Sequence, residues 1–333
     1  MPHKSATSHN VIVTIDPRIE LMSIIQLLAD YFLLSPYQTD YRRMAQAHFG
    51  GFVDHECVEH YARLSQQSFN GDAVPSAFLV LSDPPVLHQR MPFPGNTLER
   101  AGGAATLDSW FAELRDFAKQ SRFMEFFQRQ QPVFNNIIAK TQQAAQQAII
   151  PLRSYLGVPL DNCHLILGML LHHGGFGPAI SPSDGPEEYY ALIGPIGSKK
   201  NLPNFGSAKD IAIITWHEWS HSVINPLADA HSTLIASSEQ LYQPIAKHMA
   251  FHGYDSWHIT AIEHIINAIT TRLIAQVFGE QASAVALDEL LQDDYCYLPP
   301  LLERLMEYEV QRERYPTLSS FFPYLLDAFP HDR

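Results

Sequence analysis

The chain has 333 residues, of which 46% are hydrophobic and 17% charged, a composition that excludes an intrinsically disordered protein. Its formal net charge of −13 at pH 7 repels phosphate backbones and anionic lipid surfaces, so we expect no nucleic-acid partner. The three cysteines, Cys57, Cys163 and Cys296, are too few and too far apart for a disulfide framework, which fits a reducing compartment.

The N-terminal residues 1–10 carry a single lysine and no apolar stretch, so no signal peptide is visible in this chain. We therefore expect a flexible tail over 1–10 and a cytoplasmic or undetermined location. The longest apolar runs, such as residues 165–171, are much shorter than a membrane-spanning helix. The sequence favours a soluble protein with no membrane span, and it leaves the oligomeric state open.

The first half of the chain, residues 11–158, reads as an N-terminal helical region. Asp16 and Pro17 supply an N-cap and a first-turn proline ahead of an apolar stripe, and Ser35 and Pro36 predict the start of a second helix in the same way. Amphipathic or apolar patterns predict further helices over residues 54–67, 72–81, 107–119 and 132–156.

The pattern changes near residue 160, where strands are predicted. The apolar run 163–171 is typical of a buried strand, and residues 175–180 and 189–194 predict two more strands, joined by the turn-rich segment 181–186. A small antiparallel sheet is the most economical arrangement of these strands. A Gly/Lys/Asn/Pro-rich loop is expected over 194–206.

Helical periodicity returns after this loop and continues to the C-terminus. A long helix over 208–223 is expected to end at Asn225 and Pro226, because proline disfavours a helical residue before it. Further helices are predicted over residues 228–252, 256–278, 299–311 and 318–329. The expected fold class is mainly α with a small antiparallel β-sheet (α+β), in which 11–158 and the following region 159–333 form one compact unit.

One predicted helix carries the sequence His217-Glu218-Trp219-Ser220-His221. Residues four apart lie on the same helix face, so both histidines can place a ring nitrogen on one metal ion. Glu218 lies to one side of this pair, where a carboxylate reaches an attacking water without competing for the metal. The histidines share a face with apolar residues, and burying them is costly without a shared partner. We therefore expect bound Zn²⁺.

A catalytic zinc site needs a third protein ligand and an open position. The motif HExxHxxGxxH is excluded, because it requires glycine and histidine where this chain has Ile224 and Leu227. Glu263 lies 42 residues after His221 inside an otherwise apolar predicted helix, and it is the expected third ligand. The rival third ligands are His231, His258 and His264.

Asn267 follows Glu263 by one helical turn on the same face. Its side-chain oxygen could accept the outer N–H of a ligating histidine and so act in the second shell of the site. An ordinary hydrogen bond within the helix bundle explains this residue equally well.

A second group of histidines and acids lies at residues 55–60. His55 and Glu59 are separated by three residues, so the segment does not match the inverted motif HxxEH. We expect a solvated helix face there.

HExxH followed by a glutamate on a later helix is similar to the gluzincin arrangement of thermolysin-like zinc peptidases. The chain also resembles a largely uncharacterised bacterial family, a domain of unknown function with an ELxxII opening and an HEFSHSFVNP-like helix. The resemblance covers roughly residues 10 to 275, with Trp219 where phenylalanine is expected and Asn267 where the family more often has arginine. The matching segments are residues 20–29, 52–55, 175–177 and 217–226.

The resemblance implies a zincin-like core of sheet and active-site helix, surrounded by other helices, and a zinc metallopeptidase activity. In this interpretation Glu218 is the general base that takes a proton from a zinc-activated water. Tyr254 precedes Glu263 by nine residues, close to the spacing of the assisting tyrosine in thermolysin-like enzymes. His231 is the second candidate for a donor to the oxyanion, and a purely structural role remains an alternative for both.

Other functions stay open at this point. The protein could be a non-catalytic, zinc-stabilised binding protein, or a zinc amidohydrolase acting on a non-peptide substrate. A di-iron bundle is excluded, because it needs a second ExxH and Glu263 is followed by Ile266 at that spacing. The expected partner is a peptide or protein substrate, laid along an edge strand that is either 189–194 or 176–180.

Overall fold

The computed structural model describes residues 11–181 and 186–330, and it is mainly helical with two small sheets. This confirms the expected mainly α, α+β fold class. The expected tail over residues 1–10 lies outside the described residues, as does most of the expected turn at 181–186. None of the described helices combines the length and the apolar character needed to span a membrane.

The chain divides into two compact units made of interleaved segments. Unit 1 comprises Met1–Gln146 and Asp161–Glu218, and unit 2 comprises Gln147–Leu160 and Trp219–Arg333. The sequence instead favours consecutive regions, 11–158 and 159–333. The two groupings differ because two long helices, α8 (Gln131–Leu156) and α9 (Ala208–Ala230), each continue from one unit into the other.

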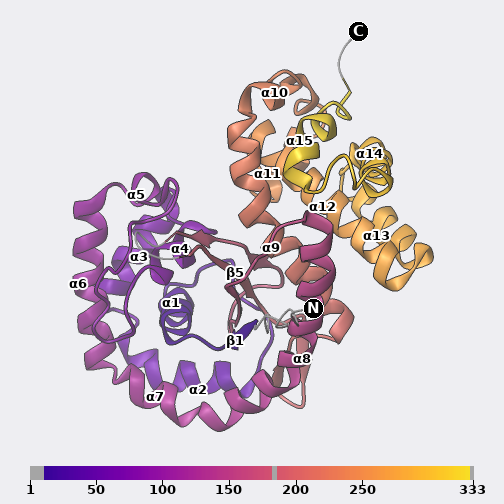
Figure 1. Cartoon of the computed structure of the whole chain (residues 1–333). Coiled ribbons are helices and arrows are strands. Elements are labelled where there is room, and N and C mark those ends of the chain that lie inside the picture. The colour runs from indigo at the N-terminus through magenta and orange to yellow at the C-terminus, as the bar shows by residue number, and fades with distance from the viewer. Residues whose placement is uncertain (1–10, 182–185, 331–333) are drawn as a thin grey trace. The chain divides into compact units, whose positions relative to one another are not determined.

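Unit 1 is organised around the buried helix α1 (Pro17–Leu28), which begins as the sequence predicts. Asp16 Oδ1 accepts a hydrogen bond from the backbone N–H of Arg18 at 2.8 Å. Figure 1 shows α1 enclosed by the other helices of the unit. These helices are α2 (Asp40–Phe49), α3 (Glu56–Gln67), α4 (Ala73–Leu79), α5 (Thr97–Arg100), α6 (Ala104–Gln120) and α7 (Phe123–Arg129).

The second helix does not start at Ser35 and Pro36. It starts at Asp40, with Thr39 as its N-cap, and Thr39 Oγ1 accepts from the backbone N–H of Arg42 at 3.2 Å. The backbone N–H of Ser35 instead donates to Leu170 O at 2.9 Å. This long-range pairing holds the segment before Thr39 out of the helix.

The main sheet of unit 1 is mixed. Its order is β1-β2-β5-β3, and β4 also pairs with β5. The antiparallel pairing expected from the sequence is found for β3 and β4 on β5, whereas β1–β2 and β2–β5 are parallel. After β2, the chain forms β3 and β4 one strand position away. It then turns back, and β5 fills the position between β2 and the edge formed by β3 and β4. The strands are β1 (Ile12–Thr14), β2 (Cys163–Leu167), β3 (Gly175–Phe176), β4 (Ala179–Ile180) and β5 (Glu188–Ile193).

Strands β3 and β4 form one edge of this sheet. Gly175 pairs with Ile193 and Ala179 pairs with Tyr189, so the two short strands keep a single register along β5. β5 lies between this edge and β2 and is an interior strand. Of the two candidate edges, the sheet therefore leaves 176–180 at its rim.

The segment predicted as a loop over 194–206 contains a hairpin of β6 (Gly197–Lys199) and β7 (Leu202–Asn204). Lys200 and Asn201 at its turn have positive φ angles of 52° and 60°. Two consecutive left-handed residues suit a two-residue hairpin turn. The strands on either side are short and polar, so the sequence pattern did not reveal this hairpin.

Helix α9 does not stop before Pro226. A proline removes one helical N–H donor, yet the backbone bonds resume after it, and His231 N–H donates to Leu227 O at 3.1 Å. The expected helix over 228–252 is also broken, into α10 (Ser232–Ala236) and α11 (Ala246–Phe251). Ser237 Oγ donates back to Leu234 O at 2.6 Å, a local bond that competes with helix continuation.

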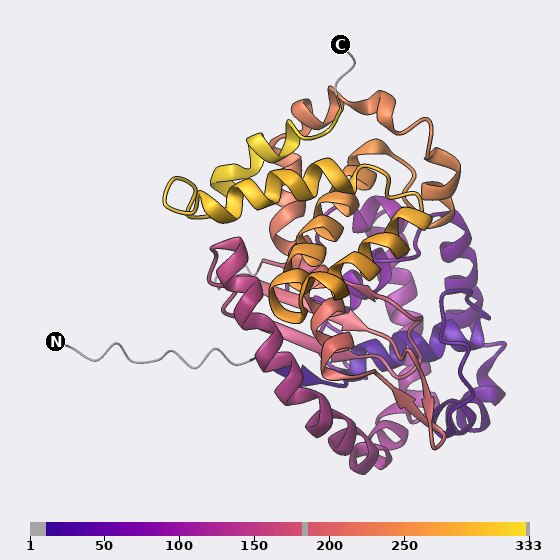
Figure 2. The ribbon, with the colours of Figure 1, turned by 90° about the vertical axis from the view of Figure 1, so that its right-hand side faces the viewer.

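Unit 2 is a layered helical assembly around α12 (Trp257–Phe278), which begins after the N-cap Ser256 as expected. α12 packs against α10 and against two later helices, and Figure 2 shows these orange and yellow helices packed side by side. The helix α13 was not expected from the sequence. The remaining helices are α13 (Glu280–Gln292), α14 (Leu298–Val310) and α15 (Leu318–Leu326).

Candidate metal centre

Helix α9 presents His217 and His221 one turn apart. The neighbouring indoles of Trp216 and Trp219 are 1% and 0% exposed, so they fix the helix in the core, while both histidines are only half-buried. Glu218 is 4% exposed. The buried tryptophans therefore fix which face of α9 is buried, and the two imidazoles on the other side stay accessible to an ion.

Helix α12 supplies the carboxylate of Glu263, which is 5% exposed and lies among buried apolar residues such as Ile262 and Ile265. Glu263 Oε1 lies 3.5 Å from His221 Nε2. A carboxylate in such a position needs strongly favourable partners, because burial removes its hydration.

His217, His221 and Glu263 each offer one ligand atom, and these three atoms all lie within 4.8 Å of one another. Zn–N and Zn–O bonds of about 2.0–2.2 Å in a tetrahedron place neighbouring ligand atoms about 3.3 Å apart. The 3.5 Å separation of His221 Nε2 and Glu263 Oε1 fits that arrangement without rebuilding the pair. Three ligands of this type leave the fourth position for water or substrate.

Asn225 orients one of the two ligand rings. Its Oδ1 lies 3.2 Å from His221 Nδ1, across one turn of α9. An acceptor at Nδ1 places the proton there and leaves the Nε2 lone pair for a metal. The sequence reasoning missed this residue, although its position four residues after His221 was the available signal.

Asn267 lies near Tyr295. It is 8% exposed and lies close enough to Tyr295 to influence the pKa of that phenol, as does Tyr254. Burial and the nearby Glu263 charge raise the pKa of Tyr295, while the polar side chains of Tyr254 and Asn267 act in the opposite direction. Tyr254 and Asn267 thus meet at Tyr295, beside the expected glutamate ligand.

Tyr295 is the residue of this neighbourhood that sequence reasoning missed. It is 7% exposed and lies between α13 and α14, 32 residues after Glu263. No motif or helical spacing connects the two positions, so only the folded chain brings them together.

His231 is not brought to this cluster. It follows His221 by ten residues, or about 15 Å along α9. Its Nδ1 lies 2.8 Å from Leu227 O, and its ring lies 5.5 Å from that of Phe322. The structure thus places His231 at the end of α9, where it bonds to the last turn of the helix.

The other two rival ligands also lie apart from the three grouped residues. His258 Nε2 lies 2.9 Å from Asp229 Oδ1. His264 is fully buried, its Nδ1 lies 2.8 Å from Thr260 O, and its ring contacts that of Tyr297. Burial lowers the pKa of His264 to about 4, so this ring is held in its neutral form.

The edge strand β3 approaches Glu218 very closely within unit 1. A Cβ placed on Gly175 would lie 2.7 Å from Glu218 Oε1, and one on Gly177 would lie 2.0 Å from Glu218 O. Such distances cannot accommodate a side chain, so glycine is required at Gly177. The edge of the sheet therefore lies directly against the expected general base.

In the second histidine-and-acid group, at residues 55–60, the two histidines make contacts within the helical unit. His55 Nδ1 accepts the backbone N–H of Cys57 at 3.2 Å and so caps α3. His60 Nδ1 lies 2.9 Å from Glu113 on α6. His55 and His60 thus turn towards α6, where His55 Nε2 also lies 3.7 Å from Asp116, whereas Glu56 and Glu59 are exposed on the helix face expected to be solvated.

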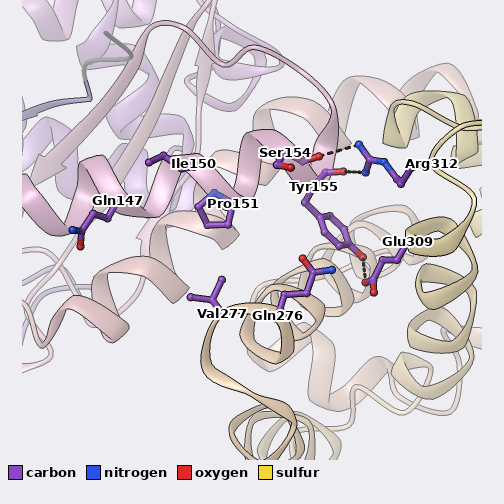
Figure 3. A pocket seen from close by; sticks show the side chains of 9 residues that line it. All are labelled: Gln147, Ile150, Pro151, Ser154, Tyr155, Gln276, Val277, Glu309 and Arg312. Carbon is purple, nitrogen blue, oxygen red and sulfur yellow. Dashed lines mark hydrogen bonds between the residues drawn. The ribbon is translucent and has the colours of Figure 1, made fainter. Parts of the chain in front are cut away.

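A large hollow of unit 2, about 740 Å³, lies away from the ligand cluster and is drawn in Figure 3. Its polar walls are paired: Arg312 Nη1 donates to Tyr155 O at 2.6 Å, and Tyr155 Oη donates to Glu309 Oε1 at 3.0 Å. None of its lining residues belongs to the cluster, so we identify the candidate site by its chemistry rather than by cavity size.

A family model described as Domain of unknown function (DUF4932) matches residues 71–328, which includes all of α9 and α12. Comparisons with curated proteins and with solved structures give no match.

Proposed function

The chain belongs to the DUF4932 family, and we propose that it is a zinc-dependent hydrolase, specifically a metallopeptidase. The observation that carries the proposal is the grouping of His217, His221 and Glu263 within 4.8 Å, with the carboxylate of Glu218 next to the first ligand. This combination of two imidazoles, a ligand carboxylate and a separate buried carboxylate is the residue set of a hydrolytic zinc site.

His217, His221 and Glu263 would hold the zinc, with Asn225 fixing the ring of His221. Zinc bound there would supply a Lewis acid that polarises an amide carbonyl and makes water nucleophilic near neutral pH.

Glu218 performs the proton transfers in this proposal. Its carboxylate accepts a proton from the attacking water and then delivers it to the amide nitrogen as the C–N bond breaks. Burial of Glu218 and the overlying backbone of Gly175 and Gly177 limit access of bulk water to this group. Tyr254, together with Tyr295, is the candidate donor to the negative charge that develops on the carbonyl oxygen.

An extended peptide is the substrate that we favour. The rim strand formed by β3 and β4 has one side paired to β5 and the other side at the sheet edge, and it passes over Glu218. A sheet edge binds an extended chain through backbone hydrogen bonds, which would carry a scissile amide towards Glu218. This argument supports a peptide over a small non-peptide amide.

The test is cleavage of a peptide library by the zinc-loaded protein and by Glu218→Gln. General acid–base catalysis contributes about 10²–10⁴-fold, so we expect the variant to lose that factor while it keeps its zinc. Glu59→Gln, on the exposed face of α3, is the matched control and should cleave as the wild type does.

Equal cleavage by Glu218→Gln and the wild type would contradict the proposed role of Glu218. Stoichiometric zinc without cleavage of any peptide or small amide would instead support the zinc-stabilised binding protein.

A further inference from the structure

A second pair of histidines lies four residues apart at the C-terminal end of α11, within unit 2; His248 is in the helix and His252 is its C-cap. His248 Nε2 and His252 Nε2 are 3.0 Å apart, and the His252 ring is exposed. His248 Nδ1, the other nitrogen of its ring, lies 3.5 Å from Asp294 Oδ2. None of these residues belongs to the His217–His221–Glu263 group.

The two Nε2 atoms hydrogen-bond to each other, and the same distance also suits two nitrogens on one metal ion, with a carboxylate behind one ring. Two ligand atoms on one tetrahedral zinc lie about 3.3 Å apart, close to the distance between the two Nε2 atoms. A carboxylate at His248 Nδ1 favours the proton on that nitrogen and leaves the Nε2 lone pair pointing at His252. Histidines that bind metals commonly have such a carboxylate behind them.

We propose that His248 and His252 bind a second, exchangeable transition-metal ion, with Asp294 as the outer partner of His248. Two imidazole ligands select Zn²⁺, Cu²⁺ or Ni²⁺ over the oxygen-seeking Mg²⁺ and Ca²⁺. The site has two protein ligands rather than three and is open to solvent, so it binds more weakly than the centre on α9 and α12.

The second site touches two segments that also reach the surroundings of Glu263. The ring of His252 stacks on that of Tyr254, with centroids 6.3 Å apart and an interplanar angle of 24°. Asp294 directly precedes Tyr295, and Tyr254 lies near enough to Tyr295 to influence its pKa. An ion bound to His248 strengthens the interaction between His248 Nδ1 and Asp294 Oδ2. It thereby orders the segments that carry Tyr254 and Tyr295.

The experiment is a calorimetric titration of metal-free protein with Zn²⁺, repeated with Cu²⁺. The wild type should bind two equivalents, and His252→Ala should lose the weaker one. Asp294→Asn should weaken that equivalent by about 10-fold, the loss typical of removing an outer carboxylate. His258→Ala is the matched control, because His258 pairs with Asp229 at 2.9 Å but is not part of a histidine pair.

Amide hydrogen exchange gives a second readout. Zinc should slow exchange over residues 293–297 in the wild type and leave it unchanged in His252→Ala. Retention of both equivalents by His252→Ala, or a single wild-type equivalent that His217→Ala abolishes, would overturn the proposal.

The second site does not depend on the proposed hydrolase. If the α9–α12 centre binds no zinc, the wild type should bind one equivalent that survives His217→Ala and disappears in His252→Ala. That result would support the α11 site while contradicting the proposed function.

Discussion

The histidine pairs on α9 and α11 share the same i, i+4 spacing, but their carboxylates stand in different places. Glu263 lies 3.5 Å from Nε2 of His221, on the side where the three ligand atoms converge. Asp294 lies 3.5 Å from Nδ1 of His248, behind the ring. The first carboxylate can be a ligand and the second can only support one, so spacing along a helix does not by itself define the kind of site.

Exposure separates the two pairs as well. The side chains of His221 and Glu263 are 15% and 7% exposed, whereas those of His248 and Asp294 are 36% and 52% exposed. Charges in a buried cluster interact through a less polar medium and are screened less by salt. The same spacing therefore gives a largely buried histidine pair on α9 and an exposed one at α11, because the surrounding elements differ.

The strand that covers α9 gives the first way to test this contrast. Gly177→Ala would place a Cβ 2.0 Å from Glu218 O, so the strand or the helix must move. We expect unfolding free energy to fall by about 3 kcal/mol, at the upper end of ordinary overpacking. Gly197→Ala is the control, because its new Cβ would meet only Asn204 Nδ2 at 3.9 Å. Denaturant titration of both variants measures the difference, and equal stability would show that the strand does not press on Glu218.

A buried carboxyl elsewhere in unit 1 tests how strongly burial acts in this protein. Burial raises the pKa of Glu20 to about 7, although its Oε1 accepts the N–H of Met169 at 2.8 Å. The folded-state pKa lies above the unfolded one, so this contribution to stability is complete below about pH 4.5 and is lost as pH rises through about 7. The loss is on the order of 3 kcal/mol, because the pKa rises from 4.5 to about 7 on folding.

Glu20→Gln should remove this pH dependence. Unfolding free energies measured between pH 5 and pH 8.5 should fall less steeply in the variant than in the wild type, with the exposed Glu99→Gln as the control. Identical pH profiles for Glu20→Gln and the wild type would show that burial of this carboxyl has little energetic effect.

The two asparagines near the centre provide the smallest expected effect. Asn225 contacts His221, whereas Asn267 contacts Tyr295. Removing a second-shell partner typically costs about 10- to 100-fold in metal affinity, so Asn225→Ala should weaken zinc binding by that factor. Asn267→Ala should weaken it less. Zinc affinities from competition with a chelating dye compare the two, and the reverse order would restore the second-shell role first expected for Asn267.

Sequence reasoning reached the fold class and the first helix because their signals are local. The N-cap of α1 and the long apolar helix α12 are each determined by residues close together in the sequence, and both are found in the structure. The parallel pairing of β2 with β5 was missed, since short strands do not reveal which neighbour they take. The break of the predicted helix over 228–252 was missed because side chains such as Ser237 cap α10 from within an unbroken helical pattern.

The candidate site shows the same division. His217, Glu218 and His221 follow from helical spacing, and Glu263 from the cost of a carboxylate in an apolar helix. Tyr295 could not be found, because it approaches Glu263 through folding of a distant segment. Its closeness to Asn267 fits the alternative that Asn267 acts within the helix bundle, and the second-shell role of Asn267 stays a prediction.

The central claim is that His217, His221 and Glu263 bind zinc, and the zinc content of the purified protein tests it most directly. After removal of loosely held ions, the wild type should retain one equivalent of zinc by elemental analysis, as should His258→Ala. His217→Ala and Glu263→Ala should retain almost none while their circular dichroism remains helical. A folded wild type that holds no zinc, or a His217→Ala variant that holds as much as the wild type, would contradict the account.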